Sequence, residues 1–258
     1  SIWVTGVQTC ALPIFIAAGY TIGDVTRASF ALARYLPNGS LDTTFSGDGK
    51  LTMDVGGSEV YAILFQPDGK IVAVGTSVLA RFHPAGTLDT TFGAAGLVNV
   101  DFSQLAAVRQ PDGKIVTAGQ IFNASTSQRE FALARFRSNG TLDTTFHTDG
   151  RVNTDVGGSG FAWAVALQPD GKIIAAGDVF SAANGHTDFA LARYLPNGTL
   201  DTTFSGDGRV TTDFGSGSQA FAVTLQPDGK TVAAGLAFGV FGLARRSEEH
   251  TSELQSPI

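Results

Sequence analysis

Eight aspartates recur at two fixed places along the chain, and their carboxylates are the first candidates for chemistry. One set lies in the segment L-D-T-T-F, and the other follows the short strand-like segment after it. The eight positions are Asp42, Asp89, Asp143 and Asp201, then Asp54, Asp101, Asp155 and Asp213. Carboxylate and hydroxyl oxygens are ligands for calcium. The weak calcium candidates are Asp42, Asp48, Asp201 and Asp207.

A structural role explains these carboxylates better than a metal does. The sequence lacks the dense D-x-D-x-D-G spacing of calcium loops. Because the aspartates recur in every copy, we expect each one to cap a turn or to pair with the arginine of its own copy. Those arginines are Arg34, Arg81, Arg135 and Arg193. We therefore predict no metal and no cofactor, and keep a calcium-stabilised structural array as an alternative.

The histidines and the known catalytic motifs indicate no active site. His83, His147 and His186 stand at non-equivalent positions, without an H-x-x-x-H spacing or a His/carboxylate cluster in the sequence. We expect them to be solvated loop residues. The sequence also lacks a nucleophile elbow, a P-loop and a dinucleotide fingerprint. We predict no catalytic residue and no enzyme activity for this chain.

Composition narrows the class of partner. Charged residues make up 16% of the 258 residues, the formal net charge is −6, and no run of Lys or Arg occurs. A nucleic-acid groove or an anionic-membrane patch is therefore not expected. The longest apolar run, Thr231–Ala244, contains three glycines and is too short to cross a bilayer. We predict no nucleic-acid partner and no membrane insertion.

Both ends of the chain are expected to be foreign to the protein. Permitted codons for residues 4–14 and for residues 246–256 are reverse complements of each other, and the DNA resembles a short-read sequencing adapter. We therefore expect residues 1–14 and 246–258 to be adapter-derived and residues 15–245 to be the native part. Cys10 and His250 lie in the two end segments, so no chemistry is built on them.

The native part is one repeated unit. The turn Q-P-D-G-K is followed by a strand-like I-x-A-x-G, then by F-A-L-A-R, and then by L-D-T-T-F. The aspartate of the P-D-G turn recurs at positions 68, 112, 170 and 228, in steps of 44, 58 and 58 residues. A period in this range indicates a solenoid, a propeller or an array. The expected copies are 15–70, 71–114, 115–172, 173–230 and a partial 231–245.

Each copy predicts four short strands. Pro227, Asp228 and Gly229 form a hairpin turn, because proline presets φ, aspartate bonds its own turn and glycine accepts positive φ. The strand 189–193 alternates large residues with alanines, and small faces let sheets stack closely. Eighteen strands are expected along the native part. Four strands in each period predict an all-β fold, a β-propeller of about four to five blades.

The combined pattern of turn and strands resembles the delta-60 repeat family. The match runs from the Q-P-D-G-K turn through F-A-L-A-R to L-D-T-T-F and covers nearly all of residues 15–245. The second copy departs from it, with a reduced loop before Val78 and with Ala95 in place of the aspartate. The resemblance implies a bacterial, secreted or surface-exposed β-propeller, therefore an extracellular location, and no defined catalytic activity.

The loops between the second and third strands vary most, and variable loops on one face are the usual binding surface of a repeat protein. Strand parity places them opposite the P-D-G turns. Their candidate residues are Tyr20, Asp24, Arg27, Asn123, Gln128, Arg129, Asn184, His186 and Asp188. We expect a non-catalytic scaffold that binds protein or glycan there. The alternative is a propeller-framed enzyme, a lyase or glycosidase whose catalytic part lies outside this chain.

Overall fold

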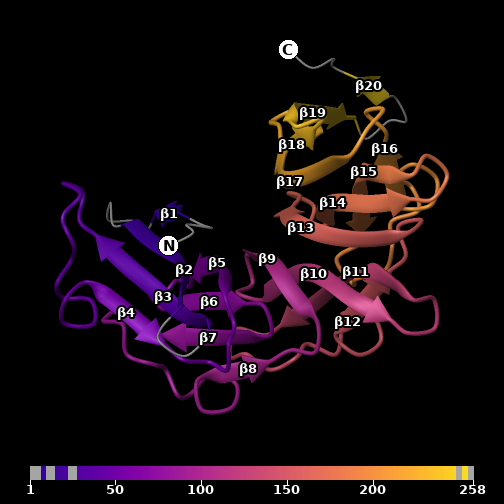
Figure 1. Ribbon diagram of the computed structural model, residues 1–258. Coiled ribbons are helices and arrows are strands. Elements are labelled where there is room, and N and C mark those ends of the chain that lie inside the picture. The colour runs from indigo at the N-terminus through magenta and orange to yellow at the C-terminus, as the bar shows by residue number, and fades with distance from the viewer. Residues whose placement is uncertain (1–6, 10–14, 23–27, 248–251, 255–258) are drawn as a thin grey trace. The chain divides into compact units, whose positions relative to one another are not determined.

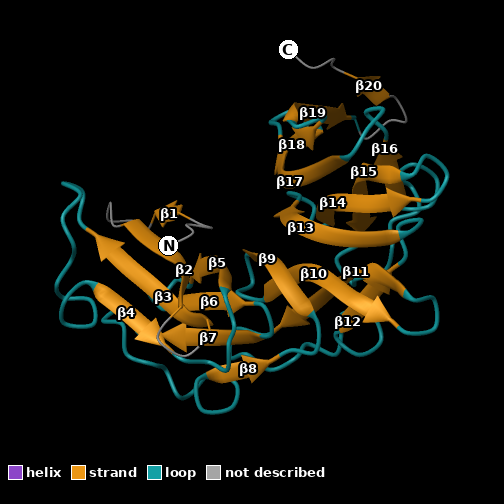
Figure 2. Ribbon diagram, in the orientation of Figure 1, coloured by secondary structure: helices purple, strands orange, loops and turns teal. Residues whose placement is uncertain are grey.

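A computed structural model describes residues 7–9, 15–22, 28–247 and 252–254, and every regular element in these ranges is a β-strand (Figures 1 and 2). The strands β2 to β19 fall within residues 15–246, and they confirm the predicted eighteen. Together with β1 and β20 they form five sheets of four strands, each strand paired with its neighbour in the sequence. The chain divides into two compact units, residues 1–115 with 136–141 and residues 116–135 with 142–258.

The first two sheets lie in the first unit. Sheet 1 consists of β1 (Val7–Thr9), β2 (Phe15–Ile22), β3 (Ala28–Tyr35) and β4 (Lys50–Met53). Sheet 2 consists of β5 (Val60–Phe65), β6 (Ile71–Gly75), β7 (Val78–Phe82) and β8 (Leu97–Asn99). The short strand β1 lies in the segment expected to be adapter-derived, and it pairs with β2 in antiparallel register.

The remaining sheets follow the same order. Sheet 3 consists of β9 (Ser103–Arg109), β10 (Ile115–Asn123), β11 (Gln128–Phe136) and β12 (Arg151–Thr154). Sheet 4 consists of β13 (Ser159–Leu167), β14 (Ile173–Ser181), β15 (His186–Tyr194) and β16 (Arg209–Thr212). Sheet 5 consists of β17 (Ser218–Leu225), β18 (Thr231–Ala237), β19 (Val240–Arg246) and β20 (Ser252–Leu254).

The segments predicted as long variable loops are largely strand, which corrects the sequence analysis. In sheet 4, β14 and β15 stay paired from Ile173 with Tyr194 to Ser181 with His186. Only residues 182–185 form the hairpin tip, and residues 124–127 do so in sheet 3. Backbone pairing continues beyond the glycine of I-x-A-x-G, where the sequence pattern stops. His186 and Asp188 are therefore held on a strand.

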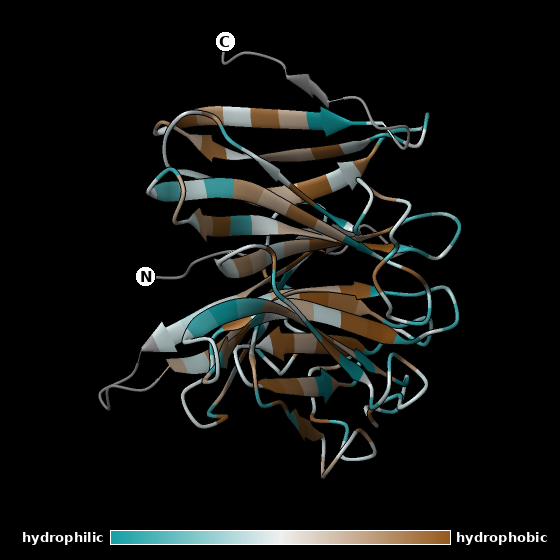
Figure 3. Cartoon of the chain, turned by 90° about the vertical axis from the view of Figure 1, so that its right-hand side faces the viewer, coloured by the Kyte–Doolittle hydropathy of each residue, from teal (hydrophilic) through white to brown (hydrophobic). Residues whose placement is uncertain are grey.

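Small side chains let neighbouring sheets pack closely, as the alternation in the sequence predicts. In the second unit, Phe189 and Leu191 of sheet 4 share a buried core with Ala220, Ala233 and Ala244 of sheet 5. The strands are mainly apolar, whereas hydrophilic residues gather in the turns and loops (Figure 3). An alanine face leaves room for the large residues of the facing sheet at normal packing density.

A buried arginine links each of the first three repeats to the turn of the next. Arg135 donates from Nε to Asp143 Oδ2 at 2.9 Å, from Nη2 to Thr145 Oγ1 at 3.2 Å, and from Nη1 to the carbonyl of Pro196 at 2.6 Å. Its guanidinium also lies 4.7 Å from the centre of the Phe146 ring. We call this arrangement the arginine latch. It fulfils the predicted pairing and adds a contact to the following repeat, which the sequence did not predict.

The latch recurs in the first unit. Arg34 contacts Asp42 and the carbonyl of Pro84, and Arg81 contacts Asp89 and the carbonyl of Ser138. Burial raises the pKa of Asp143, but hydrogen bonds from Thr145 and the charge of Arg135 outweigh it and lower the pKa. The carboxylate therefore stays charged and matches the guanidinium, whose planar donors suit such a site.

The substitution Arg135→Ala removes a complete latch. We expect it to lower the free energy of unfolding by about 3–5 kcal/mol, because the buried carboxylate of Asp143 loses the guanidinium that pairs with it. Urea unfolding followed by far-UV circular dichroism measures the change. The matched control is Lys230→Ala, which removes the exposed pair with Asp228 and should cost about 0–1 kcal/mol. Equal effects of the two substitutions would show that the latch does not hold the repeats together.

The glycine of the P-N-G turn at residues 196–198 packs against the latch phenylalanine of the preceding repeat. Gly198 has a φ of +90°, and a Cβ at this position would lie 2.8 Å from the Phe146 ring. Gly206 has almost the same φ, +91°, but a Cβ there would meet nothing within 4 Å. Substitution of these two glycines therefore distinguishes the cost of backbone strain from the cost of close packing.

We expect Gly206→Ala to cost about 1–2 kcal/mol through its left-handed backbone alone. Gly198→Ala should cost about 1–3 kcal/mol more, since the added methyl group must also displace Phe146. Thermal and urea unfolding of the two variants give the difference directly. If both variants lose the same stability, the contact between the turn and Phe146 contributes nothing.

Candidate functional site

The hairpin end of sheet 4 brings together three potential ligands that lie apart in the sequence. His186 and Asp188 are two residues apart on β15, and Asp213 follows β16, which pairs with β15. His186 Nε2 lies 2.9 Å from Asp213 Oδ1 and 3.3 Å from Asp188 Oδ1. We call these three residues the His186 cluster. In the part of the chain that the structure describes, no other group of three His, Cys, Asp or Glu side chains could hold a metal ion.

Asn184 at the hairpin tip orients both carboxylates. Its Nδ2 donates to Asp188 Oδ2 at 3.0 Å and to Asp213 Oδ2 at 3.3 Å. Its Oδ1 accepts from the backbone N–H of His186 at 3.2 Å, so the tip itself fixes the amide. The hydrogen bond to Asp213 raises the pKa of His186, and burial raises the pKa of Asp188.

The expectation of isolated, solvated histidines is wrong for His186. The sequence shows no His/carboxylate cluster because Asp213 is 27 residues away, and only the pairing of β15 with β16 brings it near. His147 is exposed and contacts Thr148, and His83 lies 3.8 Å from Asp89. Only one of the three histidines therefore gathers two carboxylates of the hairpin end.

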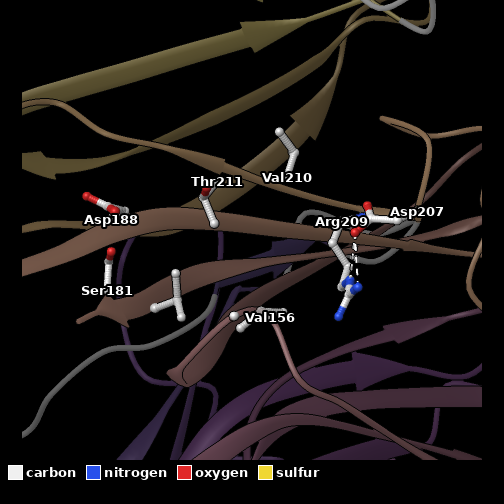
Figure 4. Close-up of a pocket in the computed structure, with 9 residues that line it drawn as sticks. Val156, Ser181, Asp188, Asp207, Arg209, Val210 and Thr211 are labelled. Carbon is white, nitrogen blue, oxygen red and sulfur yellow. Dashed lines mark hydrogen bonds and ion pairs between the residues drawn. The ribbon is translucent and has the colours of Figure 1, made fainter. Parts of the chain in front are cut away.

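A pocket of about 320 Å³ adjoins the His186 cluster (Figure 4). Asp188 and Ser181 lie at one end of it, and the ion pair of Asp207 with Arg209 lies at the other. Val156 and Val210 contribute apolar wall between them. The pocket thus offers charged groups of both signs and a small apolar surface.

A second feature of the same unit is a row of aromatic side chains on the first strands of sheets 4 and 5. The rings of Phe161 and Trp163 are stacked with centroids 5.4 Å apart, and Phe221 meets Trp163 edge-on at 5.8 Å. Arg129 lies over the other end, 5.4 Å from the Phe161 centroid. We call Phe161, Trp163 and Phe221 the aromatic row. Phe221 is 44% exposed, so the row reaches the surface.

A β-bulge places the central member of the row. The pairing of β13 with β14 shifts between Ala162 and Ala164, and the pairing of β17 with β18 shifts between Ala220 and Ala222. Trp163 and Phe221 are the extra residues, and Tyr61 is the extra residue at the equivalent shift in sheet 2. A bulge re-aims a side chain without changing the rest of the ladder.

The sequence analysis missed this row, because it looked for variation only in the loops. Trp163, Phe221, Tyr61 and Leu105 each stand five residues before the glutamine of Q-P-D-G-K. A comparison of the copies at this position would have shown that its side chain changes while its surroundings repeat.

The residues predicted from the sequence to form a binding surface lie in different parts of the structure. Tyr20 lies on β2, and Asn123 donates to Glu130 at 2.6 Å. Arg129, next to Gln128 on β11, donates to Gln120 at 2.8 Å. Asn184, His186 and Asp188 come together as described above. Asp24 and Arg27 lie outside the described residues.

The calcium candidates are engaged in structural contacts. Asp42 and Asp201 pair with the latch arginines at 2.9 Å. Asp48 and Asp207 each accept from the backbone N–H two residues later, at 2.8 and 2.9 Å. Among the described residues, none of the four belongs to a group of three potential ligands.

Asp178 is a buried carboxylate beside the row. It is 2% exposed and accepts from Trp163 Nε1. Burial raises its pKa to about 6, although the hydrogen bonds from Trp163 and Gln219 oppose the shift. The folded chain therefore holds this proton at a pH where the unfolded chain has released it.

The substitution Asp178→Asn keeps the acceptor for Trp163 and removes the charge. A raised pKa in the folded state stabilises the wild-type protein below about pH 4, and this contribution is lost as the pH rises through about 6. We expect the variant to gain about 2 kcal/mol on the wild type at pH 7.5 relative to pH 4. Urea unfolding of both proteins at the two pH values measures it. A difference independent of pH would contradict the assignment.

Comparisons with known proteins agree with this architecture. Solved structures with a similar fold include a protein of unknown function from Bacteroides caccae, with a TM-score of 0.53, 10% identity and coverage of 91% of this chain and 71% of that one. A protein from Lactobacillus plantarum gives a TM-score of 0.54 at 14% identity, covering 94% and 67%. A glucose dehydrogenase gives a TM-score of 0.54 at 10% identity, covering 95% and 83%. These similarities concern the fold alone.

No curated protein matches the sequence. Within the described residues, no helix has the length and apolar character needed to cross a membrane. One family model matches four stretches, residues 14–45, 66–92, 110–146 and 168–204, which together make up just over half of the chain. Each stretch carries the repeated turn or the repeated strands, and the sheets built from them are those of a propeller. The chain belongs to the family described as domain of unknown function (DUF5122) beta-propeller.

Proposed function

We propose that the chain is a non-catalytic binding module of a secreted or surface bacterial protein, and that its second unit binds a protein or glycan ligand. The aromatic row is the observation that carries this proposal. Aromatic side chains combine a large apolar surface with rigid geometry, and Trp and Arg are enriched where binding energy concentrates. The row, with Arg129 at its end, supplies both.

Further exposed rings lie at the hairpin ends of the same unit. Phe122, Phe180 and Phe238 occupy the third position after the glycine of their I-x-A-x-G strands and are 58%, 46% and 59% exposed. Exposed apolar side chains that recur at one end of a unit are candidates for an interaction surface. Because one ring recurs in each of three repeats, an extended ligand has several equivalent contacts.

Polar groups near the aromatic row can orient a bound ligand. Arg129 is exposed and carries a guanidinium, whereas the buried Asp178 holds the indole of Trp163 by accepting a hydrogen bond from its Nε1. A few polar groups beside an apolar surface are the usual means of orienting a bound ligand. The repeated carboxylates are held by the latches and the turns, which supports a non-catalytic role. The resemblance of the repeat to the delta-60 family supports an extracellular location.

Tryptophan fluorescence tests the proposal directly, because the chain has only two tryptophans. In a Trp3→Phe background, Trp163 is the only reporter. We would titrate a panel of bacterial and plant oligosaccharides, which carry no tryptophan, and measure the binding of surface proteins separately on the immobilised chain. We expect at least one glycan to shift the emission with saturation, since contact with the row changes the surroundings of the indole, or at least one surface protein to bind with saturation.

The variant Phe221→Ala should weaken that binding about tenfold or more, as loss of a central aromatic contact does. Tyr61→Ala is the matched control, because Tyr61 occupies the equivalent bulge in sheet 2, outside the row. Unfolding curves establish that both variants are folded. Full affinity in Phe221→Ala, or a panel without any binder, would overturn the proposal.

A further inference from the structure

We propose that the His186 cluster binds a divalent metal ion of the zinc class through His186 Nε2, Asp188 Oδ1 and Asp213 Oδ1. One ligand atom from each of the three residues lies within 4.8 Å of the other two. The site is independent of the aromatic row and of the ligand proposed for it.

The separations of the three atoms suit a single ion. Zinc binds histidine nitrogen and carboxylate oxygen at about 2.0–2.2 Å, so that ligand atoms on a tetrahedron lie about 3.4 Å apart. The distances from the imidazole nitrogen to the two oxygens are 2.9 and 3.3 Å. A small shift of the Asp213 side chain, which is 50% exposed, brings the set to coordination distance.

The charge of the cluster also fits a divalent cation. With a neutral imidazole, the two carboxylates carry two negative charges, which one divalent ion neutralises. Asp188 is only 4% exposed, and an ionised carboxylate in such a place needs a counter-charge. A divalent ion bound by the three residues would supply it.

Asn184 behaves as an outer-shell residue of such a site. Its amide donates to Asp188 Oδ2 and Asp213 Oδ2, and at 3.2 Å to Asp188 Oδ1 as well. The backbone N–H of Gly215 donates to Asp213 Oδ1, so both carboxylates are held beside the histidine. Hydrogen bonds of this kind fix the orientation of ligating carboxylates and support metal affinity. Asn184 is itself fixed by the N–H of His186, so the hairpin tip presets the site.

Imidazole together with carboxylates distinguishes zinc from calcium. Calcium takes six to eight oxygen ligands, whereas imidazole is a preferred ligand of zinc and its neighbours in the transition series. Three protein ligands leave a coordination position for water or for a group of a bound molecule. Asp188 also lines the pocket of Figure 4, so that position is within reach of a small ligand.

The test uses the full chain with Cys10→Ser and His250→Gln, which removes a thiol and an imidazole that could bind zinc elsewhere. Zinc chloride alone is titrated by calorimetry at neutral pH, and cobalt(II) chloride is added in parallel to record visible absorption. We expect one ion to bind per chain, together with the intense visible bands of four-coordinate cobalt. Calcium chloride should give no saturable heat.

His186→Gln and Asp213→Asn should each weaken zinc binding at least a hundredfold and remove the cobalt bands. Asn184→Ala should weaken it about tenfold to a hundredfold, as loss of an outer-shell contact does. His147→Asn is the matched control and should bind as the parent does, because His147 has a φ of 51° that asparagine tolerates. Circular dichroism establishes that each variant is folded. The proposal is overturned if zinc does not bind with saturation, or if folded His186→Gln binds it as tightly as the parent.

Discussion

The repeated structure depends on the arginine latch. A guanidinium at the end of one strand holds the carboxylate of its own repeat, the hydroxyl of a threonine and a carbonyl of the following repeat, while its flat face covers a phenylalanine. These contacts use most of the N–H donors of the guanidinium, which is buried. Removal of any partner leaves a desolvated charge, which makes the group act as a unit. The conserved chemistry of the L-D-T-T-F segment within this chain is therefore structural.

The position of the latch explains where the chain is free to vary. It lies at the end of each sheet that carries the P-D-G and P-N-G turns, and the antiparallel pairing places the hairpin tips at the opposite end. Because sheet packing and repeat order are set at the turn end, the hairpin ends differ among copies without disturbing the core. The His186 cluster and the exposed phenylalanines both lie there. The bulges in the first strands of sheets 2, 4 and 5 offer a second position at which the side chain can vary.

Much of this fold follows from residue patterns. The period, the turn chemistry and the alternation of large and small residues give the strands, the sheet order and the alanine-based packing, and the recurring Arg and Asp give the pair within a repeat. The contact of Arg135 with Pro196 does not follow, because a pattern within one repeat does not show which residue of the next lies beside it. The contact of His186 with Asp213 does not follow from the pattern either, because only the pairing of the strands brings the two residues together. The bulge at Trp163 is a register shift, and an alternating pattern contains no signal for one.

The latch also gives every repeat a direction. One side presents a guanidinium and the other presents a turn carbonyl, so the contact is heterologous, and the second and third repeats each supply both halves of it. Insertion or deletion of a whole repeat in the gene therefore preserves the contact at each new junction without compensating substitutions. Lengthening by internal duplication is accordingly open to a chain of this kind, and each added copy brings another hairpin end whose residues are free to diverge.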